Sequence, residues 1–279
     1  MYKIKNLKLK NPYFLAPMEA INDIAFRTLC KKAGAGLVYT GMINPLTKQK
    51  IDLEDKPAIQ LFSKDGKGIR EFIKKHDKEA MLWDFNLGCP AKTAKRHGFG
   101  FFMNNELELI EKILSEMRQA TKKPLTIKIR ISQNTEKIIK IAEKYCEAIS
   151  IHPRTQAQGY SGKPDIAFVE RIKSQTSLPI IYSGNVNEKN ANKLSESFDF
   201  VMIGREAIGN PNIFSKLSGS KKEFSFKDYL KIATKYKLSF SQIKNQAMNF
   251  TKNQNGAKKM RASLIRARNL EDIKKVYSI

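Results

Sequence analysis

The stretch from Trp83 to Gly100, WDFNLGCPAKTAKRHGFG, holds the residues whose types and spacing point most directly to chemistry. An apolar run from Met81 to Phe85 breaks into Asn86, Cys89 and Pro90, which is typical of a buried strand that delivers a thiol to a loop. A thiol at such a place can take part in a reaction. A free cysteine is also commonly a buried structural residue, so this stretch alone leaves both interpretations open.

The elements that position this loop are indicated by short apolar runs that alternate with segments of helical periodicity. The expected strands are 13–16, 36–40, 58–62, 81–85, 125–129, 148–151, 180–182 and 200–203. The expected helices include 23–33, 68–75, 106–121, 135–145, 166–175 and 188–195. Eight strands in this α/β pattern predict a (β/α)8 TIM barrel more readily than an open doubly wound sheet.

Polar side chains at the expected strand ends support a barrel, because all of these ends meet at one rim, where such enzymes have their active sites. They include Thr40, Gln60, Asn86, Lys128, Arg130, His152, Arg154 and Asn185, and Met42 lies among them after Thr40. Loops are polar in any protein, but amides, a lysine and a histidine within or just after apolar runs are costlier than loop polarity requires. Lys128, between Ile127 and Ile129, needs an anionic partner for its charge.

The last two expected strands end in residues that suit a phosphate group. Gly184 and Gly204 let backbone N–H groups approach an oxyanion, Arg205 adds a charged fork, and this is the usual phosphate site of the barrel. The chain lacks both a G-x-G-x-x-G after a strand and a G-x-x-x-x-G-K-[ST], so a Rossmann domain and a P-loop have no support. A mononucleotide such as FMN is consistent with the pattern, although tight turns explain the glycines almost as well.

Composition limits the remaining possibilities. The 279 residues are 41% hydrophobic, which is ample for a core, and the three cysteines form no C-x-x-C pair, so we expect no disulfide framework and no metal site. The amino-terminal segment lacks a long apolar core, and no run approaches membrane-spanning length. We therefore expect a cytoplasmic protein with no membrane association.

The charge is strongly positive, with 51 Lys and Arg against 27 Asp and Glu and a formal net charge of +24. Such an excess favours a polyanionic partner, while a lysine-rich proteome is the plainer explanation. The segment from residue 222 to 279 contains 14 basic and 4 acidic residues, so it is the more densely positive part. Apolar and aromatic residues from Tyr229 to Ile243 at helical spacing predict helices there.

Several stretches resemble the tRNA-dihydrouridine synthases in sequence and in order. They are LAPMEAINDIAFR (15–27), AIQLF (58–62), NLGCPAK (86–92), TIKIR (126–130), IHPRTQAQGYSG (151–162), YSGNV (182–186), VMIGREAIGNPNIF (201–214) and NGAKKMR (255–261). The resemblance implies an FMN-binding TIM-barrel catalytic domain over 1–217 and a small basic helical tRNA-binding domain over 224–279. It also implies reduction of the C5–C6 double bond of particular uridines in tRNA, with NADPH or NADH as reductant and no obligatory protein partner.

The resemblance implies a role for each matching residue. The flavin ring would be contacted by Pro17, Met18, Glu19, Gln60, Lys128 and His152, and its phosphate by Ser183, Gly184, Asn185, Gly204 and Arg205. The substrate would be contacted by Asn86, Lys92, Arg154, Lys258, Lys259 and Arg261. In the loop from Lys92 to His97, the residues Lys92, Lys95 and Arg96 are candidate contacts for tRNA phosphates, although a solvated run of charges is nearly as good an explanation.

The resemblance makes Cys89 the catalytic acid. Hydride goes from the flavin to C6 of the uracil, and a proton must then reach C5. An ordinary thiol has a pKa of about 8.5 and is mostly protonated at neutral pH, so it suits this role.

Two rival functions remain on the sequence alone: a small-molecule FMN oxidoreductase of the dihydroorotate dehydrogenase type, and a non-catalytic tRNA-binding protein. The basic carboxy-terminal extension and the NLGCPAK loop speak against the first. A yellow colour on purification would argue against the second.

Overall fold

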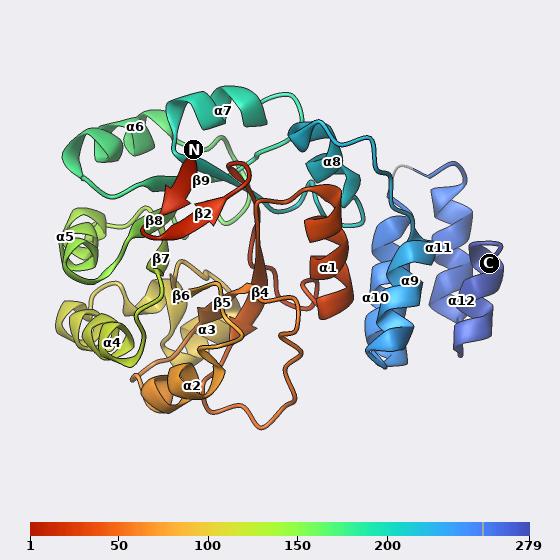
Figure 1. The fold of residues 1–279 in the computed structure, drawn as a ribbon, viewed down its shortest axis with the longest axis horizontal. Coiled ribbons are helices and arrows are strands. Elements are labelled where there is room, and N and C mark those ends of the chain that lie inside the picture. The colour runs from red at the N-terminus through yellow and green to blue at the C-terminus, as the bar shows by residue number, and fades with distance from the viewer. Residues whose placement is uncertain (253) are drawn as a thin grey trace.

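The computed structural model describes residues 1–252 and 254–279 (Figure 1). Parallel strands close into a barrel in the order β10-β3-β4-β5-β6-β7-β8-β9, so the predicted TIM barrel is confirmed. The barrel strands are β3 (Tyr13–Leu15), β4 (Leu37–Ile43), β5 (Ala58–Leu61), β6 (Leu82–Leu87), β7 (Leu125–Arg130), β8 (Ala148–His152), β9 (Ile180–Ser183) and β10 (Phe200–Ile203).

Helices follow the strands and cover the outside of the barrel (Figure 1). They are α1 (Ile24–Ala33), α2 (Ile69–His76), α4 (Leu107–Ala120), α5 (Thr135–Tyr145), α6 (Ile166–Gln175), α7 (Ala191–Ser197) and α8 (Asn212–Ser218). The apolar runs predicted these strands well because a parallel strand is buried on both faces.

Strand β6 shows how the two faces differ. Trp83, Phe85 and Leu87 point outward and belong to the large core shared with the helices, whereas Leu82 belongs to the smaller core inside the barrel. Because side chains alternate along a strand, Asp84 and Asn86 lie on the inward face. The lumen is therefore apolar at the amino-terminal end of the strands and polar toward their carboxyl ends.

A hairpin that the sequence reasoning missed closes the amino-terminal end of the barrel. Strands β1 (Tyr2–Ile4) and β2 (Leu7–Leu9) pair antiparallel, and Ile4 and Leu9 join the core inside the barrel. Each strand has only three residues, with Lys3 and Lys8 at the exposed middle positions, so the apolar signal is too short to stand out.

The segment from Lys92 to His97, expected to be a loop, is instead the helix α3, which is a correction to the prediction. It has six residues and buries only Ala94, so no apolar stripe marked it. A short 3₁₀ turn, Gly100–Met103, follows and contacts β6.

In the described part of the chain after α8, the helices are α9 (Phe226–Lys235), α10 (Phe240–Phe250), α11 (Ala257–Arg266) and α12 (Leu270–Val276). A capping box formed by Ser225 and Asp228 begins α9. Figure 1 shows α9 and α10 beside α1, and the ring of Phe250 meets the edge of the ring of Phe26 there. Among the described residues, no helix is both long and apolar enough to cross a bilayer.

Candidate active site

A chain of hydrogen bonds crosses the polar layer of the barrel and ends at Cys89. Asp84 accepts hydrogen bonds from the Thr126 hydroxyl and, at 2.6 Å, from Gln60 Nε2. Gln60 Oε1 in turn accepts from Asn86 Nδ2 at 2.8 Å. Asn86 Oδ1 then accepts the backbone N–H groups of Gly88 at 3.2 Å and Cys89 at 3.0 Å.

The direction of this chain is set by Asp84. An ionised carboxylate only accepts hydrogen bonds, so Gln60 must turn its NH₂ group toward Asp84 and its oxygen toward Asn86. That arrangement leaves Asn86 Oδ1 free to hold the loop of Cys89. Asp84 and Gln60 are fully buried, so water does not compete for these bonds.

Two further contacts fix the Cys89 loop. Arg130 Nε donates to the carbonyl of Gly88 at 3.0 Å, and the backbone N–H of Phe101 donates to the carbonyl of Cys89 at 3.2 Å. Gly100 has a φ of +62°, and a Cβ there would lie 2.9 Å from Cys89 Cβ, so this position requires glycine. Cys89 itself is half-buried, whereas Cys30 and Cys146 are buried.

Lys128 lies across from Asn86 in the register of β6 and β7. Burial lowers the pKa of Lys128 to about 8, and the neighbouring Arg130 lowers it too, while the Asp84 charge raises it. Burial raises the pKa of Asp84 to about 6, against hydrogen bonds from Thr126 and Gln60 and the charge of Lys128. The anionic partner expected for Lys128 is thus supplied in part by Asp84.

Cations surround His152 at the end of β8. Burial is the main cause that lowers the pKa of His152 to about 2, and the charges of Lys128, Arg130, Arg154 and Arg205 lower it further. The imidazole is therefore neutral at physiological pH. This concentration of positive charge at the mouth of the barrel favours an anionic ligand.

Arg154 was expected to contact substrate, but the structure buries it completely. Its guanidinium donates to the carbonyls of Ser161 at 2.9 Å and Gly162 at 2.7 Å and lies 3.0 Å from His152 Nε2. Arg154 therefore holds the loop between β8 and α6 in place rather than facing solvent.

The tip of that loop carries Tyr160, whose ring contacts two guanidinium groups. Arg130 Cζ lies 5.2 Å and Arg205 Cζ 5.6 Å from the centre of the Tyr160 ring. Arg130 Nη1 also donates to the carbonyl of Gly159 at 2.6 Å. Arg130 thus joins the loop of Cys89 to the loop of Tyr160.

The residues expected to hold a phosphate are brought together. Ser183 ends β9 and pairs in register with Met202 of β10, and Arg205 donates a hydrogen bond to Asn185 Oδ1. Gly184 has a φ of +149°, and a Cβ at Gly204 would meet only ordinary contacts, the nearest being Ala16 Cβ at 3.7 Å.

The loop after β3 carries Pro17, Met18 and Glu19 to the same rim. Burial raises the pKa of Glu19, and the nearby backbone N–H of Met42 acts in the opposite direction by lowering it. Met18 lies beside Gly204, because a Cβ at Gly204 would be 3.9 Å from Met18 Sδ.

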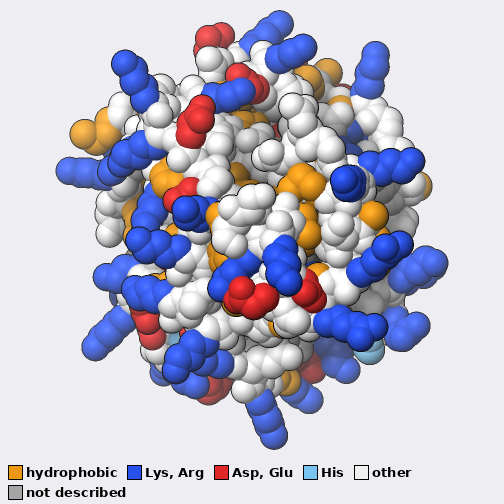
Figure 2. Space-filling view, turned by 90° about the vertical axis from the view of Figure 1, so that its right-hand side faces the viewer, with side chains coloured by type: hydrophobic (Ala, Val, Ile, Leu, Met, Phe, Trp, Pro, Cys, Tyr) orange, Lys and Arg blue, Asp and Glu red, His pale blue; other side chains and the backbone are white. Residues whose placement is uncertain are grey.

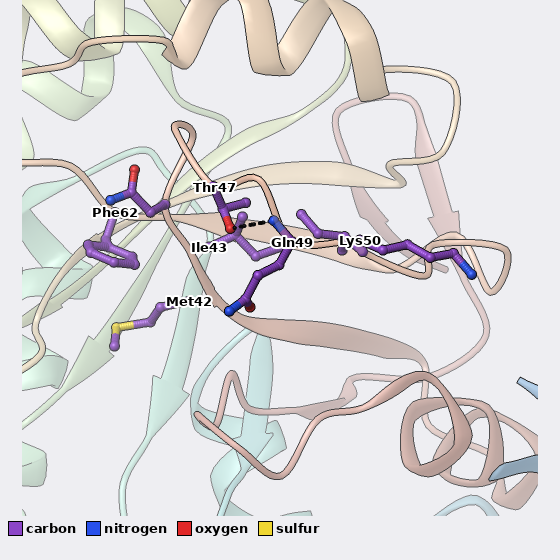
Figure 3. A pocket seen from close by; sticks show the side chains of 8 residues that line it. Met42, Ile43, Thr47, Gln49, Lys50 and Phe62 are labelled. Atoms are coloured by element: carbon purple, nitrogen blue, oxygen red, sulfur yellow. Dashed lines mark hydrogen bonds between the residues drawn. The ribbon is translucent and has the colours of Figure 1, made fainter. Parts of the chain in front are cut away.

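A pocket of about 230 Å³ opens at the carboxyl ends of β4 and β5 (Figure 3). Met42, Ile43 and Phe62 supply apolar walls, and Thr47, Gln49 and Lys50 come from the loop that follows β4. The Phe62 ring lies 4.3 Å from the ring of Phe99, next to the Gly100 that packs on Cys89. The pocket therefore adjoins the Cys89 loop.

Among the remaining expected substrate contacts, Lys92 is exposed at the start of α3, and Lys258, Lys259 and Arg261 are exposed on α11. Arg261 Nη1 donates to Thr251 Oγ1 at 3.0 Å. Figure 2 shows the face presented by the carboxy-terminal helices, with Lys and Arg side chains spread over it and fewer Asp and Glu side chains. This face is suited to a large anion.

Sequence reasoning missed Asp84, Tyr160 and the bridging role of Arg130. The signal for Asp84 was present, because a charge between Trp83 and Phe85 in an apolar run is as costly as Lys128 between two isoleucines. Nothing in the local sequence indicated that Tyr160 contacts two arginines.

Comparison with known proteins is consistent with this barrel and its polar mouth. The solved structure of morphinone reductase in complex with tetrahydroNAD superposes with a TM-score of 0.52 over 81% of this chain and 92% of that one, at 12% identity, which shows the fold. The chain thus has the architecture of a TIM barrel, with its polar residues at the carboxyl ends of the strands.

Residues 14–277 match the family model for dihydrouridine synthase (Dus). A probable tRNA-dihydrouridine synthase of Rickettsia bellii is 34% identical over 78% of this chain and 73% of its own length. The tRNA-dihydrouridine synthase B of Escherichia coli K12 is 30% identical over 77% of this chain and 74% of its own length. The chain belongs to the dihydrouridine synthase family.

Proposed function

We propose that this chain is a tRNA-dihydrouridine synthase, which reduces the C5–C6 double bond of particular uridines in tRNA. FMN is its cofactor, and NADPH or NADH supplies the electrons. The observation that carries the proposal is the position of Cys89. In a chain of this family, Asn86 holds the thiol loop by a 3.0 Å hydrogen bond, on the same rim as Lys128 and the cations around His152.

The residues at the rim suit a flavin mononucleotide. Their positive charge, which lowers the pKa of His152, matches a phosphate and an electron-rich ring, and Gly204 leaves room for a close approach. Pro17, Met18, Glu19, Lys128 and His152 would hold the ring, and Ser183, Gly184, Asn185, Gly204 and Arg205 the phosphate. When bound, a reduced flavin supplies hydride to C6 of the uracil.

We propose a different role for Gln60 from the direct contact with the flavin ring that the sequence resemblance implied. Its amide is buried and already bonds Asp84 and Asn86 at 2.6 and 2.8 Å. We therefore assign Gln60 to the support of Asn86 and of the Cys89 loop. Lys128, which is mostly protonated below about pH 8, provides the positive charge next to this layer.

Cys89 supplies the proton. The S–H bond breaks as a C–H bond forms at C5 of the uracil, and the thiolate left behind takes a proton from solvent before the next turnover. The hydrogen bond to Asn86 and the packing of Gly100 fix the thiol for this transfer. Asn86 and the pocket beside Phe62 are the proposed uracil-facing surface.

The carboxy-terminal helices would grip the tRNA through Lys258, Lys259 and Arg261, with Lys92 contributing at the mouth of the barrel. We thus propose a catalytic domain over 1–217 and a tRNA-binding domain over 224–279, the latter described except at residue 253. The target uridine would have to leave the tRNA stack to reach Cys89.

A direct test uses purified full-length protein. We expect a yellow protein with the absorption bands of oxidised flavin, and dihydrouridine in an unmodified tRNA transcript after incubation with NADPH, detected by mass spectrometry. A colourless protein that binds tRNA would support a non-catalytic role, and a yellow protein that leaves tRNA unchanged would support a small-molecule oxidoreductase.

A further inference from the structure

The loop between β3 and α1, residues 16–23, is held from two sides. On the barrel side Asn22 Nδ2 donates to the carbonyls of Ala16 at 2.7 Å and Tyr39 at 2.8 Å. On its other side lie the carboxy-terminal helices, since α9 and α10 stand beside α1 (Figure 1). This loop carries Met18 and Glu19 to the rim of the barrel.

Helix α10 binds the loop through two consecutive amides. Asn245 Nδ2 donates to the carbonyl of Ala20 at 3.0 Å, and Gln246 Nε2 donates to the carbonyl of Ile21 at 2.6 Å. The same Gln246 nitrogen donates to Asp23 Oδ2 at 2.9 Å. One helix of the carboxy-terminal group therefore satisfies acceptors along the loop, and both N–H bonds of Gln246 are used.

A second helix adds to this contact. The Tyr229 hydroxyl of α9 donates to Asp23 Oδ2 at 3.2 Å, while Asp23 Oδ1 caps the first turn of α1 by accepting from the N–H of Phe26. Gln246 and Tyr229 are fully buried, so water cannot take over their hydrogen bonds.

The loop needs such support because its backbone is strained. Ala20 has a φ of +57°, a left-handed conformation that residues other than glycine rarely adopt. A conformation of this kind persists only where its surroundings fix it. The hydrogen bond from Asn245 falls on the carbonyl of Ala20 itself.

A shift of the backbone at Ala20 would move Glu19 and Met18, which lie one and two residues away at the mouth of the barrel. A Cβ at Gly41 would lie 3.3 Å from the carbonyl oxygen of Met18 and 3.5 Å from Glu19 Oε2, so the loop is in close contact with β4. On the opposite side Met18 lies beside Gly204. The loop is therefore part of the floor on which a ligand at the mouth would rest.

We infer that Asn245 and Gln246 of the carboxy-terminal helices are positioning residues for the active site, which fix the loop of Met18 and Glu19 against the flavin. The inference rests on the proposed function and adds to it. The helical segment would then do more than bind tRNA, because the barrel depends on it for the shape of its own cofactor site.

The test compares Gln246→Glu with the wild-type protein, both full length. Glutamate keeps the shape of glutamine but has no N–H to donate, and its charge faces the Ile21 carbonyl and the Asp23 carboxylate. We expect about a tenfold or larger loss of FMN affinity and a changed circular dichroism of the bound flavin. Turnover should fall, while tRNA affinity should stay within about twofold because the exposed cations of α11 are untouched.

The matched control is Tyr277→Phe, which removes the hydrogen bond that the Tyr277 hydroxyl gives to the carbonyl of Ala247 on the same helix. It loosens the helices without touching the loop, so flavin affinity and dichroism should stay as in the wild type. Asn245→Asp, at an exposed position with a single hydrogen bond, provides a milder loop variant should Gln246→Glu fail to fold.

Normal flavin dichroism and turnover in both loop variants would overturn the inference, as would an equal loss in Tyr277→Phe, which would indicate general loosening. A wild-type protein that binds no flavin would contradict the proposed function and this inference together. A wild-type enzyme that is active, with unaffected loop variants, would contradict this inference alone.

Discussion

The side-chain amide of Gln60 donates a 2.6 Å hydrogen bond to the buried carboxylate of Asp84. This one contact decides the orientation of the amides between the barrel interior and the thiol. Because the Gln60 nitrogen is fixed on Asp84, its oxygen receives Asn86, and Asn86 Oδ1 holds the backbone of Cys89 at 3.0 Å. The position of Cys89 thus depends on a residue that does not touch it.

Replacing Asp84 by asparagine should therefore disturb the thiol loop. If the introduced amide turns its NH₂ group toward Gln60, the side-chain amides of Gln60 and then of Asn86 must rotate by half a turn. Asn86 would then present its NH₂ group to the backbone N–H of Cys89. We expect turnover to fall about tenfold or more, because buried unpaired donors are costly. The measurements are the rate of dihydrouridine formation and the rate of alkylation of Cys89 by iodoacetamide.

The control for Asp84→Asn is Asp199→Asn, since Asp199 accepts the N–H of Ile180 at 2.9 Å and takes no part in the chain to Cys89. Unchanged turnover and alkylation in Asp84→Asn would rule out the orienting role of the carboxylate.

The pH dependence of the reaction should reflect Lys128. Its pKa is lowered to about 8, so the ammonium is present below that pH and loses its proton as the pH rises through it. We expect kcat/KM for tRNA to fall above about pH 8. Lys128→Arg keeps the charge at all working pH values, so the alkaline fall should move to higher pH; a fall that stays near pH 8 in that variant would assign it to another group.

We also expect kcat/KM for tRNA to fall as the pH drops below about 6, because burial raises the pKa of Asp84 to about 6. Below that pH the carboxyl gains a proton and becomes a donor, which reverses the amides in the same way as the asparagine variant. The acidic limb should be lost in Asp84→Asn, and its persistence there would show that another group titrates.

Binding of tRNA should weaken when Lys258 and Lys259 are both replaced by alanine. Each lost phosphate contact reduces the slope of log affinity against log salt by about one. The control is Lys137→Ala with Lys140→Ala, two exposed cations on α5. An equal loss in both double variants would indicate general charge attraction instead of a grip by the carboxy-terminal helices.

Cys89→Ala should retain flavin and tRNA but lose uridine reduction, because it removes the proton donor and little else. General acid catalysis contributes about a hundredfold or more, so the single-turnover rate of dihydrouridine formation should fall by at least that factor. The control is the reduction of the flavin by NADPH, which is monitored by the loss of its yellow colour. The rate of this step should be the same in Cys89→Ala as in the wild type.

The barrel could be predicted from the sequence because several strands that face both the barrel interior and the helices are unbroken apolar runs, as in Tyr13–Leu15 and Phe200–Ile203. The first hairpin and α3 could not, since three and six residues carry too little periodicity. The break between α9 and α10, from Lys235 to Phe240, could not be predicted either, because apolar residues continue at helical spacing across it.

The site was predictable where chemistry stands out locally and not where it depends on a partner far along the chain. Cys89 and Lys128 are conspicuous in their own segments. Arg154 was expected to contact substrate, yet its guanidinium donates to the carbonyls of Ser161 and Gly162. The contact of Gln246 with Ile21 joins residues 225 positions apart, which no local pattern reveals.

The most direct test of the central claim is the mapping of dihydrouridine in tRNA from a strain that lacks this gene. We predict that dihydrouridine disappears from one or more tRNA positions, returns with the wild-type gene and does not return with the Cys89→Ala gene. The strain should contain no other enzyme of this family. Two results would contradict the account: unchanged dihydrouridine after the deletion, or full restoration of dihydrouridine by the Cys89→Ala gene.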